Sequence, residues 1–165
     1  MSGSTDLPSA ASAAVSVELA RADLGFSAAH FSVVGGVSER LHGHNYRVSL
    51  RASGGIGDDG AVVDFRLLKA AIRAECSALD ERMLIPADSA ALAIDAHDDA
   101  VEVREGQRRF VFPLSDVVLL PVANTTCECL ATYLLGAMRA RLGALPVRFQ
   151  LSVEELPGQG ATVTE

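Results

Sequence analysis

The sequence predicts an α+β protein in which two helices cover one face of an antiparallel sheet. The candidate strands alternate apolar and polar residues, so each has one buried face and one solvated face. Two longer segments repeat apolar residues at helical spacing, which predicts amphipathic helices. The order along the 165 residues is two strands, a helix, a small hairpin, a helix and a strand. This order is typical of helices packed on one face of antiparallel strands.

The first half of the predicted sheet comes from two alternating runs. Residues 15–19 form the first strand, and residues 43–51 form the second. In the second run every other residue from Tyr46 to Leu50 is apolar, so these side chains share one face. The segment between the strands, residues 26–36, is expected to be irregular. Glycines and aspartates over residues 54–60 predict a turn.

Each helix has a recognisable beginning. Asp64 is expected to cap a helix over residues 65–79. A second helix is expected to begin near Asn124, where Thr125 and Glu128 have the spacing of a capping box, and to end before Gly143. The apolar stripe of the first helix comprises Leu67, Leu68, Ala71, Ile72 and Leu79, and that of the second comprises Leu130, Leu134, Ala137 and Met138.

The remaining strands are short. Residues 101–103 and 110–112 alternate around Glu105 and Gly106, so we expect a hairpin there. Residues 147–153 alternate again and complete the sheet. One copy would leave a sheet face and the sheet edges uncovered, which predicts a homo-oligomer.

Composition limits the possible functions. The net charge is −7, which argues against broad binding to nucleic acid or to anionic membranes. Thirteen of the 14 cations are arginine, so a local phosphate-binding pocket is still possible. No apolar run reaches the ~20 residues that span a bilayer. Residues 1–14 resemble a frayed tail rather than an export signal, and the three cysteines then indicate reduced thiols and a cytoplasmic location.

Three of the four histidines form the most informative pattern. His42 and His44 are two apart at the start of a strand, so both side chains lie on one face. His30 precedes them and could fold back as a third ligand. Three imidazoles with an open position are typical of catalytic zinc. The alternative is that His42 and His44 are surface residues and His30 is a core histidine, and spacing alone leaves both open.

Several motifs together resemble the 6-pyruvoyltetrahydropterin synthase family, which includes the 6-carboxytetrahydropterin synthases. They are FSAAH over residues 26–30, LHGHNY over 41–46, VDF over 63–65, Leu68-Lys69, Leu79-Asp80, NTTCECLA over 124–131, and Val153-Glu154-Glu155. The resemblance implies a tunnelling fold, with a four-stranded antiparallel sheet and two helices on one face. It also implies that trimers stack into hexamers, and that His30, His42 and His44 hold Zn²⁺. Residues 84–122 are longer than expected and are interpreted as an insertion within a single domain, 15–165.

Two departures from the family pattern bear on mechanism. Family synthases carry a cysteine shortly before HGH, whereas this chain has Glu39 there. That resembles the type III subgroup, which cleaves 7,8-dihydroneopterin triphosphate to 6-hydroxymethyl-7,8-dihydropterin. The family's Asp-His pair is Asp80-Glu81 here, which leaves these two as the remaining acid–base candidates. Their alternative role is a solvated helix end.

The resemblance also assigns residues that bind the pterin. Glu155 matches the family glutamate that anchors the ring, and a carboxylate can accept two hydrogen bonds from the 2-amino group and a ring N–H. Thr125 and Thr126 are expected to add contacts. Glu154 competes with Glu155 for the anchoring role, and the threonines could simply cap a helix.

The expected function is therefore a zinc-dependent pterin side-chain lyase with Glu39, Asp80 and Glu81 in catalysis. Two alternatives remain: the ordinary 6-pyruvoyl- or 6-carboxytetrahydropterin synthase reaction, and a pterin-binding relative without catalysis. The expected partners are a small pterin and further copies of the same chain.

Overall fold

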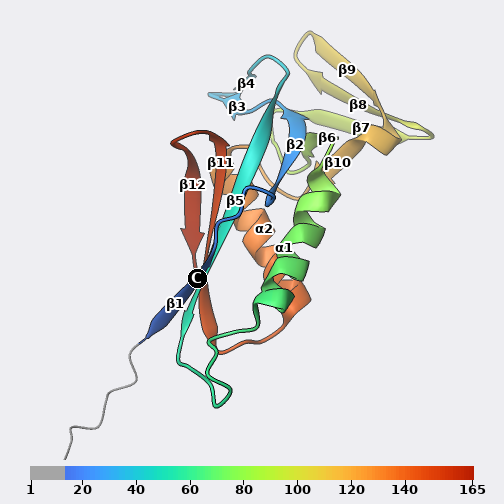
Figure 1. The fold of residues 1–165 in the computed structure, drawn as a ribbon. Coiled ribbons are helices and arrows are strands. Elements are labelled where there is room, and N and C mark those ends of the chain that lie inside the picture. Colours follow the sequence, from blue (N-terminus) through green and yellow to red (C-terminus); the bar gives the residue numbers. More distant parts are fainter. Residues whose placement is uncertain (1–13) are drawn as a thin grey trace, which may run out of the picture.

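The computed structural model describes residues 14–165, so the predicted tail lies outside the described residues except for Ala14. Two α-helices and a long curled sheet form the body of the molecule, and a separate small sheet projects from it (Figure 1). The α+β class is confirmed. None of the helices in the described part is long and apolar enough to span a bilayer.

An antiparallel group of strands forms the centre of the sheet. It comprises β1 (Val15–Leu19), β2 (Gly25–His30), β5 (His42–Gly54), β11 (Val147–Leu156) and β12 (Gln159–Thr164). β1 and β2 pair one after the other along the same edge of β5, while β11 pairs along the opposite edge and β12 follows it. β1 and β2 together take the place of one interrupted strand. Counted in this way, the five strands form the four-stranded antiparallel arrangement that the resemblance implied.

Two parallel strands extend this sheet. β6 (Arg82–Pro86) pairs with β2, and β10 (Val117–Leu120) pairs with β6, both in parallel. The sheet is therefore mixed and has seven strands in the described residues, because two parallel strands that the sequence did not indicate extend the expected antiparallel arrangement. The parallel strands cover the edge that β2 would otherwise expose.

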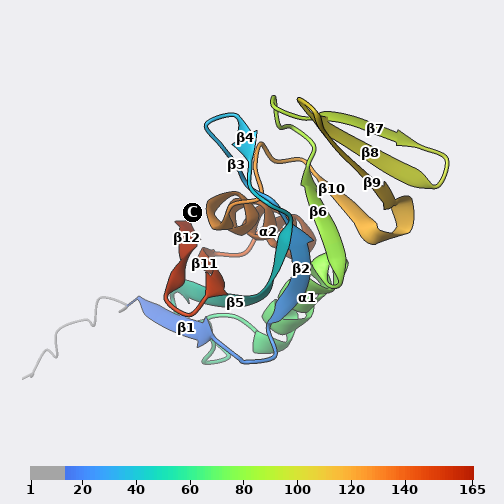
Figure 2. The same cartoon turned by 90° about the horizontal axis from the view of Figure 1, so that it is seen from above.

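Helices α1 (Phe65–Leu79) and α2 (Cys127–Leu142) pack on the same side of the sheet (Figure 2). Asp64 caps α1 as predicted, because its side chain accepts a hydrogen bond from the Arg66 amide. The predicted stripe of α1 is buried apart from Leu67, which is 52% exposed, and Ala137 of α2 is half-buried. The capping box is wrong: α2 begins at Cys127, its N-cap is Thr126, and no side chain caps it.

The predicted hairpin is part of a second, three-stranded sheet. It consists of β7 (Ala93–His97), β8 (Ala100–Glu105) and β9 (Arg108–Pro113), all antiparallel. A turn of 3-10 helix, Leu114–Asp116, follows it. The inner face of this sheet packs in a core of its own, which contains Phe31, Met83, Ile85, Val101 and Val103.

Two further segments differ from expectation. Residues 26–36 were expected to be irregular, but most of β2 and the strand β3 (Val33–Val34) lie within them. β3 forms a small hairpin with β4 (Val37–Ser38). The hairpin turns at Gly35 and Gly36, which have φ of 61° and 80°. The last predicted strand also continues to Leu156 and returns as β12, which the sequence did not indicate.

Candidate metal centre and active-site cavity

The pairing of β2 with β5 brings three histidines together. His30 and His42 are directly opposite each other across the two strands, and His44 lies two residues further along β5. Their ring centroids are 4.6 Å (His30–His42), 5.2 Å (His30–His44) and 4.9 Å (His42–His44) apart. One ring nitrogen from each lies within 4.8 Å of the others. The sequence predicted this cluster, and the antiparallel register explains it.

His30 is held by the segment that precedes α2. Its Nδ1 is 3.1 Å from the Thr125 carbonyl oxygen and 3.3 Å from Thr125 Oγ1. His30 is 1% exposed, and burial, with the nearby His42, lowers its pKa to about 4. It is therefore neutral near pH 7 and donates from Nδ1 to the carbonyl, which leaves the Nε2 lone pair free. That Nε2 is buried and has no hydrogen-bond partner among the described residues.

His42 is oriented in the same manner. Its Nδ1 donates to the Arg40 carbonyl oxygen at 2.7 Å, which leaves its Nε2 as the ligand atom. Ligating histidines commonly donate their second ring N–H to a carbonyl in this way. Three clustered imidazoles, two of them oriented by backbone carbonyls and one with an otherwise unpartnered buried nitrogen, fit Zn²⁺ with one position open for a substrate.

A cavity of about 380 Å³ opens beside the histidines. Its polar lining comes from several elements: the three histidines, Ser32, Glu39, Thr126, Cys127, Glu128, Glu155 and Gln159. Glu39 lies in the loop after β4 and Thr126 at the start of α2. The structure therefore brings Glu39, Thr126 and Glu155 to the histidines, as predicted from the sequence.

Glu155 lies at an irregularity of the sheet. The register of β11 with β12 shifts between Glu154 and Leu156, so the residue between them is out of the regular alternation. A bulge of this kind re-aims a side chain. Glu155 Oε2 lies 4.0 Å from His44 Nε2, and Glu155 Oε1 accepts a hydrogen bond from Gln159 Nε2 at 2.7 Å. Gln159 is a cavity residue that the sequence did not indicate, because β12 was not predicted.

Cys127, the first residue of α2, also lines the cavity and lies beside Glu155. Burial, together with the negative charge of Glu155, raises the pKa of its thiol to about 12. The thiol therefore stays protonated at neutral pH and is a weak base. Nearby, burial also raises the pKa of Tyr46, whose hydroxyl is buried and has no partner among residues 14–165.

Comparison with known proteins identifies the family. The sequence profile of 6-pyruvoyl tetrahydropterin synthase matches residues 20–165. The chain belongs to the 6-pyruvoyl tetrahydropterin synthase family. It is 30% identical over 145 residues to a Methanocaldococcus jannaschii protein with the provisional name 6-carboxy-5,6,7,8-tetrahydropterin synthase, and the match covers 85% of this chain and 89% of that protein.

Solved structures of the family agree with the fold. The crystal structure of 6-pyruvoyl tetrahydropterin synthase from Plasmodium vivax superposes with a TM-score of 0.88 at 31% identity, covering 93% of this chain and 98% of the other. The Plasmodium falciparum enzyme gives 0.85 at 31% identity, covering 93% and 97%. Two further Plasmodium vivax structures are variants of a catalytic glutamate, replaced by alanine or by cysteine. The tunnelling fold expected from the resemblance is thereby confirmed.

Thr125 has a role within the chain besides the predicted one. It is completely buried, its Oγ1 donates to the Phe31 carbonyl at 2.9 Å, and its amide donates to Asn124 Oδ1 at 2.9 Å. Its carbonyl holds His30. Within the chain, Thr125 therefore positions a histidine, and its expected contact with the pterin stays a prediction.

Asp80 and Glu81 lie away from the cavity of their own chain. Asp80 follows α1, and its Oδ1 accepts a hydrogen bond from the Ser27 amide at 2.7 Å. The Glu81 amide donates to the Ser27 carbonyl at 2.7 Å. Ser27 precedes His30 by three residues on β2, a separation of about 10 Å along a strand. Within one chain, the structure does not bring these two acids to the histidines.

Proposed function

We propose that this chain is a zinc-dependent lyase that cleaves the side chain of 7,8-dihydroneopterin triphosphate and releases 6-hydroxymethyl-7,8-dihydropterin. The observation that carries the proposal is a carboxylate, Glu39, in one cavity with three histidines, where the only thiol among the described lining residues is held protonated. The family relationship supports a pterin as the substrate.

The cavity residues divide into two groups. His30, His42 and His44 would hold the zinc, and when bound the ion supplies a Lewis acid that lowers the pKa of a nearby alcohol. Glu155 and Gln159 are neighbours in the same cavity, where the carboxylate can accept from the 2-amino group and a ring N–H of a pterin. Thr126 lines the same cavity.

Glu39 is the proposed general base. It removes the proton from the hydroxyl on the second side-chain carbon, and the bond between the first and second carbons then breaks. The bonding electrons pass into the pterin ring, and the two-carbon aldehyde leaves with the triphosphate. A proton returned to the first carbon completes the product. The reaction needs no oxidant, and an oxygen-bound proton is within the reach of a carboxylate base.

The comparisons offer support for a carboxylate base, because a Plasmodium vivax relative has a catalytic glutamate. The name of the Methanocaldococcus jannaschii relative favours the alternative, 6-carboxytetrahydropterin synthase activity. In that case another group would have to replace the missing thiolate. Cys127 is a poor substitute, since the pKa of its thiol is about 12.

The test is the product formed. Zinc-loaded protein is incubated with 7,8-dihydroneopterin triphosphate, and the pterins are identified by mass spectrometry. We expect 6-hydroxymethyl-7,8-dihydropterin. A pyruvoyl or carboxy product would overturn the cleavage reaction, and unchanged substrate that still binds tightly would indicate a relative without catalysis.

The role of Glu39 is tested by Glu39→Gln. Loss of the base should lower kcat about 10²- to 10⁴-fold while zinc content is unchanged. Glu128→Gln is the matched control, because Glu128 lines the same cavity from the first turn of α2. If Glu39→Gln turned over at the wild-type rate, Glu39 would not be the base.

A further inference from the structure

The turn between β8 and β9 lies beside the loop that carries Glu39. It contains two residues, Gly106 and Gln107, and Gly106 has φ of 55°. Glu105 and Arg108 are therefore directly opposite each other at the end of the hairpin. Opposed residues of an antiparallel pair point to the same side, so a carboxylate and a guanidinium are presented together.

Their side is the inner face of the three-stranded sheet. Val101, Val103 and Phe110 share that face by alternation and belong to the second core. Phe110 stacks on Phe31, with ring centroids 5.4 Å apart and planes at 20°. Phe31 follows His30 directly, so the hairpin is anchored on the strand that supplies a histidine of the candidate metal centre. The anchoring brings the end of the hairpin to Ser38 and Glu39.

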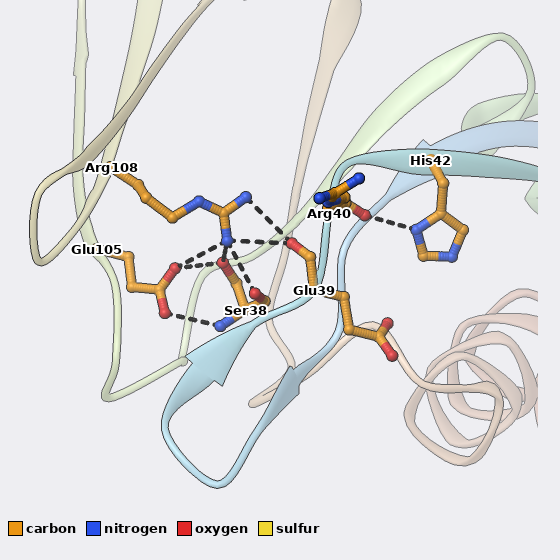
Figure 3. Close-up of polar contacts among 6 residues, drawn as sticks. All are labelled: Ser38, Glu39, Arg40, His42, Glu105 and Arg108. Carbon is orange, nitrogen blue, oxygen red and sulfur yellow. Dashed lines mark hydrogen bonds and ion pairs between the residues drawn. The ribbon is translucent and has the colours of Figure 1, made fainter.

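Glu105 and Arg108 bind the backbone of this loop, as Figure 3 shows. The Ser38 amide donates to Glu105 Oε1 at 2.7 Å, and the Ser38 hydroxyl donates to the other carboxylate oxygen. Arg108 Nη1 donates to the Ser38 carbonyl at 2.8 Å, and both of its terminal nitrogens donate to the Glu39 carbonyl at 3.1 Å. Arg108 also lies 3.4 Å from Glu105 and over the ring of Phe110.

The contacts with Ser38 are partly shielded from water, whereas those of Arg108 with the Glu39 carbonyl are exposed. Ser38 is buried, and the Glu105 side chain is 10% exposed. The hydrogen bonds from Ser38, with Arg108 nearby, lower the pKa of Glu105. Glu105 therefore accepts as a carboxylate, and charge-assisted hydrogen bonds of this kind are stronger than neutral ones.

The arrangement holds Glu39 by its backbone and leaves its side chain free. The Glu39 amide donates to the Ser32 carbonyl at 2.9 Å, and its carbonyl is bound by Arg108. The carboxylate points away from Arg108 (Figure 3). A direct ion pair would weaken the carboxylate as a base, whereas a backbone contact does not. The next carbonyl, that of Arg40, orients His42.

We propose that Glu105 and Arg108 are positioning residues that fix the Glu39 loop against the histidines, so that the β8–β9 hairpin serves catalysis. This rests on the proposed role of Glu39 as the base. It assigns a function to the segment over residues 84–122, for which the sequence suggested none.

Arg108→Ala tests the proposal. A misplaced base should lower kcat about 10- to 100-fold, with KM changed less. Arg109→Ala is the matched control, because Arg109 is the neighbouring residue on the same strand and pairs with Glu102 on the outer face. Glu105→Gln should retain more activity than Glu105→Ala, since an amide oxygen can still accept from Ser38. Equal kcat for Arg108→Ala and wild type would overturn the proposal.

A double-mutant cycle separates this proposal from the proposed function. If Arg108 acts through Glu39, Arg108→Ala should cause no further loss in the Glu39→Gln background, measured in single turnovers at high enzyme concentration. Equal losses in both backgrounds would show that Arg108 acts independently and would overturn the inference. A fully active Glu39→Gln would instead reject Glu39 as the base, and the positioning role with it.

A second readout needs neither zinc nor substrate. Amide hydrogen exchange at Ser38 should be faster in Glu105→Ala than in wild type, and unchanged in Arg109→Ala. Unchanged exchange in Glu105→Ala would show that the hairpin does not hold the loop.

Discussion

Thr125 shows how a buried residue can orient a candidate metal ligand without lining the cavity. Its hydroxyl, amide and carbonyl bind Phe31, Asn124 and His30 respectively. The sequence suggested a helix cap, because threonine three residues before glutamate is the local pattern of a capping box. The tertiary contact with Phe31, the residue after β2, replaces that local bond. Residue spacing could not reveal this, since Phe31 and Thr125 are 94 residues apart.

Thr125→Val should weaken zinc binding. Valine keeps the shape and the carbonyl that holds His30, but it leaves the Phe31 carbonyl without its donor. We expect a loss of about 1–3 kcal/mol in the free energy of unfolding. Zinc affinity should fall about 10-fold, as for other residues that orient ligating histidines. Competition with a chromogenic chelator measures the affinity, and Thr132→Val on the exposed side of α2 is the control. Unchanged affinity would mean that the backbone alone positions His30.

His30 also predicts how stability depends on pH in the zinc-free protein. Its pKa is about 4 in the folded chain and near 6.5 when unfolded. Below pH 6.5 the unfolded chain therefore binds the proton more readily, and stability falls as the pH drops toward 4. The expected slope is at most about 1.4 kcal/mol per pH unit. Urea unfolding between pH 4.5 and 7 should show this slope in wild type and a smaller one in His30→Gln. Equal slopes would contradict the buried neutral histidine.

At the scale of elements, the sequence predicted those helices and strands that a local pattern of residues specifies. Helix α1 has the predicted bounds and N-cap because its amphipathic repeat and Asp64 act locally. β2 was missed because alanines occupy its centre, and alanine is a weak strand former. That strand is formed by pairing with β5 on one side and β6 on the other. β12 was missed because glycine and glutamine open it.

The close approach of β12 to β11 predicts an effect on substrate binding. A Cβ added to Gly160 would lie 2.3 Å from the Val153 carbonyl oxygen and 2.8 Å from the Glu154 Cα. Gly160→Ala should therefore push β12 away and displace Gln159 and Glu155. We expect KM for the pterin to rise about 10-fold, with kcat changed less. Gly136→Ala is the control, because that position in α2 is open, and alanine there should stabilise by about 0.5–1 kcal/mol. An unchanged KM would argue against Glu155 as the pterin anchor.

At the scale of the whole molecule, one copy leaves a sheet face and a sheet edge uncovered. Both helices lie on one face, and the other carries polar contacts such as Ser152 to Thr162 at 2.7 Å. A hollow of about 600 Å³, lined in part by Arg47 and Glu154, lies where the loop after β1 meets β5, β11 and β12. Within residues 14–165, β12 is an edge strand. Joining such edges between copies would remove them, as closure of a barrel does.

An assembly of several copies could bring Asp80 to the cavity of a neighbouring chain. Asp80 is exposed and lies away from the histidines of its own chain. If it is catalytic, it must act in the cavity of a neighbouring copy. Glu39→Gln and Asp80→Asn should then each be inactive alone. Co-expression should restore about a quarter of the activity, because only cavities that combine the intact Glu39 of one variant with the intact Asp80 of the other are complete.

The matched control for this complementation is Glu39→Gln co-expressed with His42→Ala. Glu39 and His42 line the same cavity within one chain, so the cavity of every chain lacks one of the two residues. No activity should therefore return. Sedimentation should show that all three variants assemble as the wild type does. An active Asp80→Asn would remove Asp80 from the mechanism. If both variants are inactive and fail to complement although mixed oligomers form, Asp80 and Glu39 act in the cavity of the same chain. That result would contradict a site shared between copies.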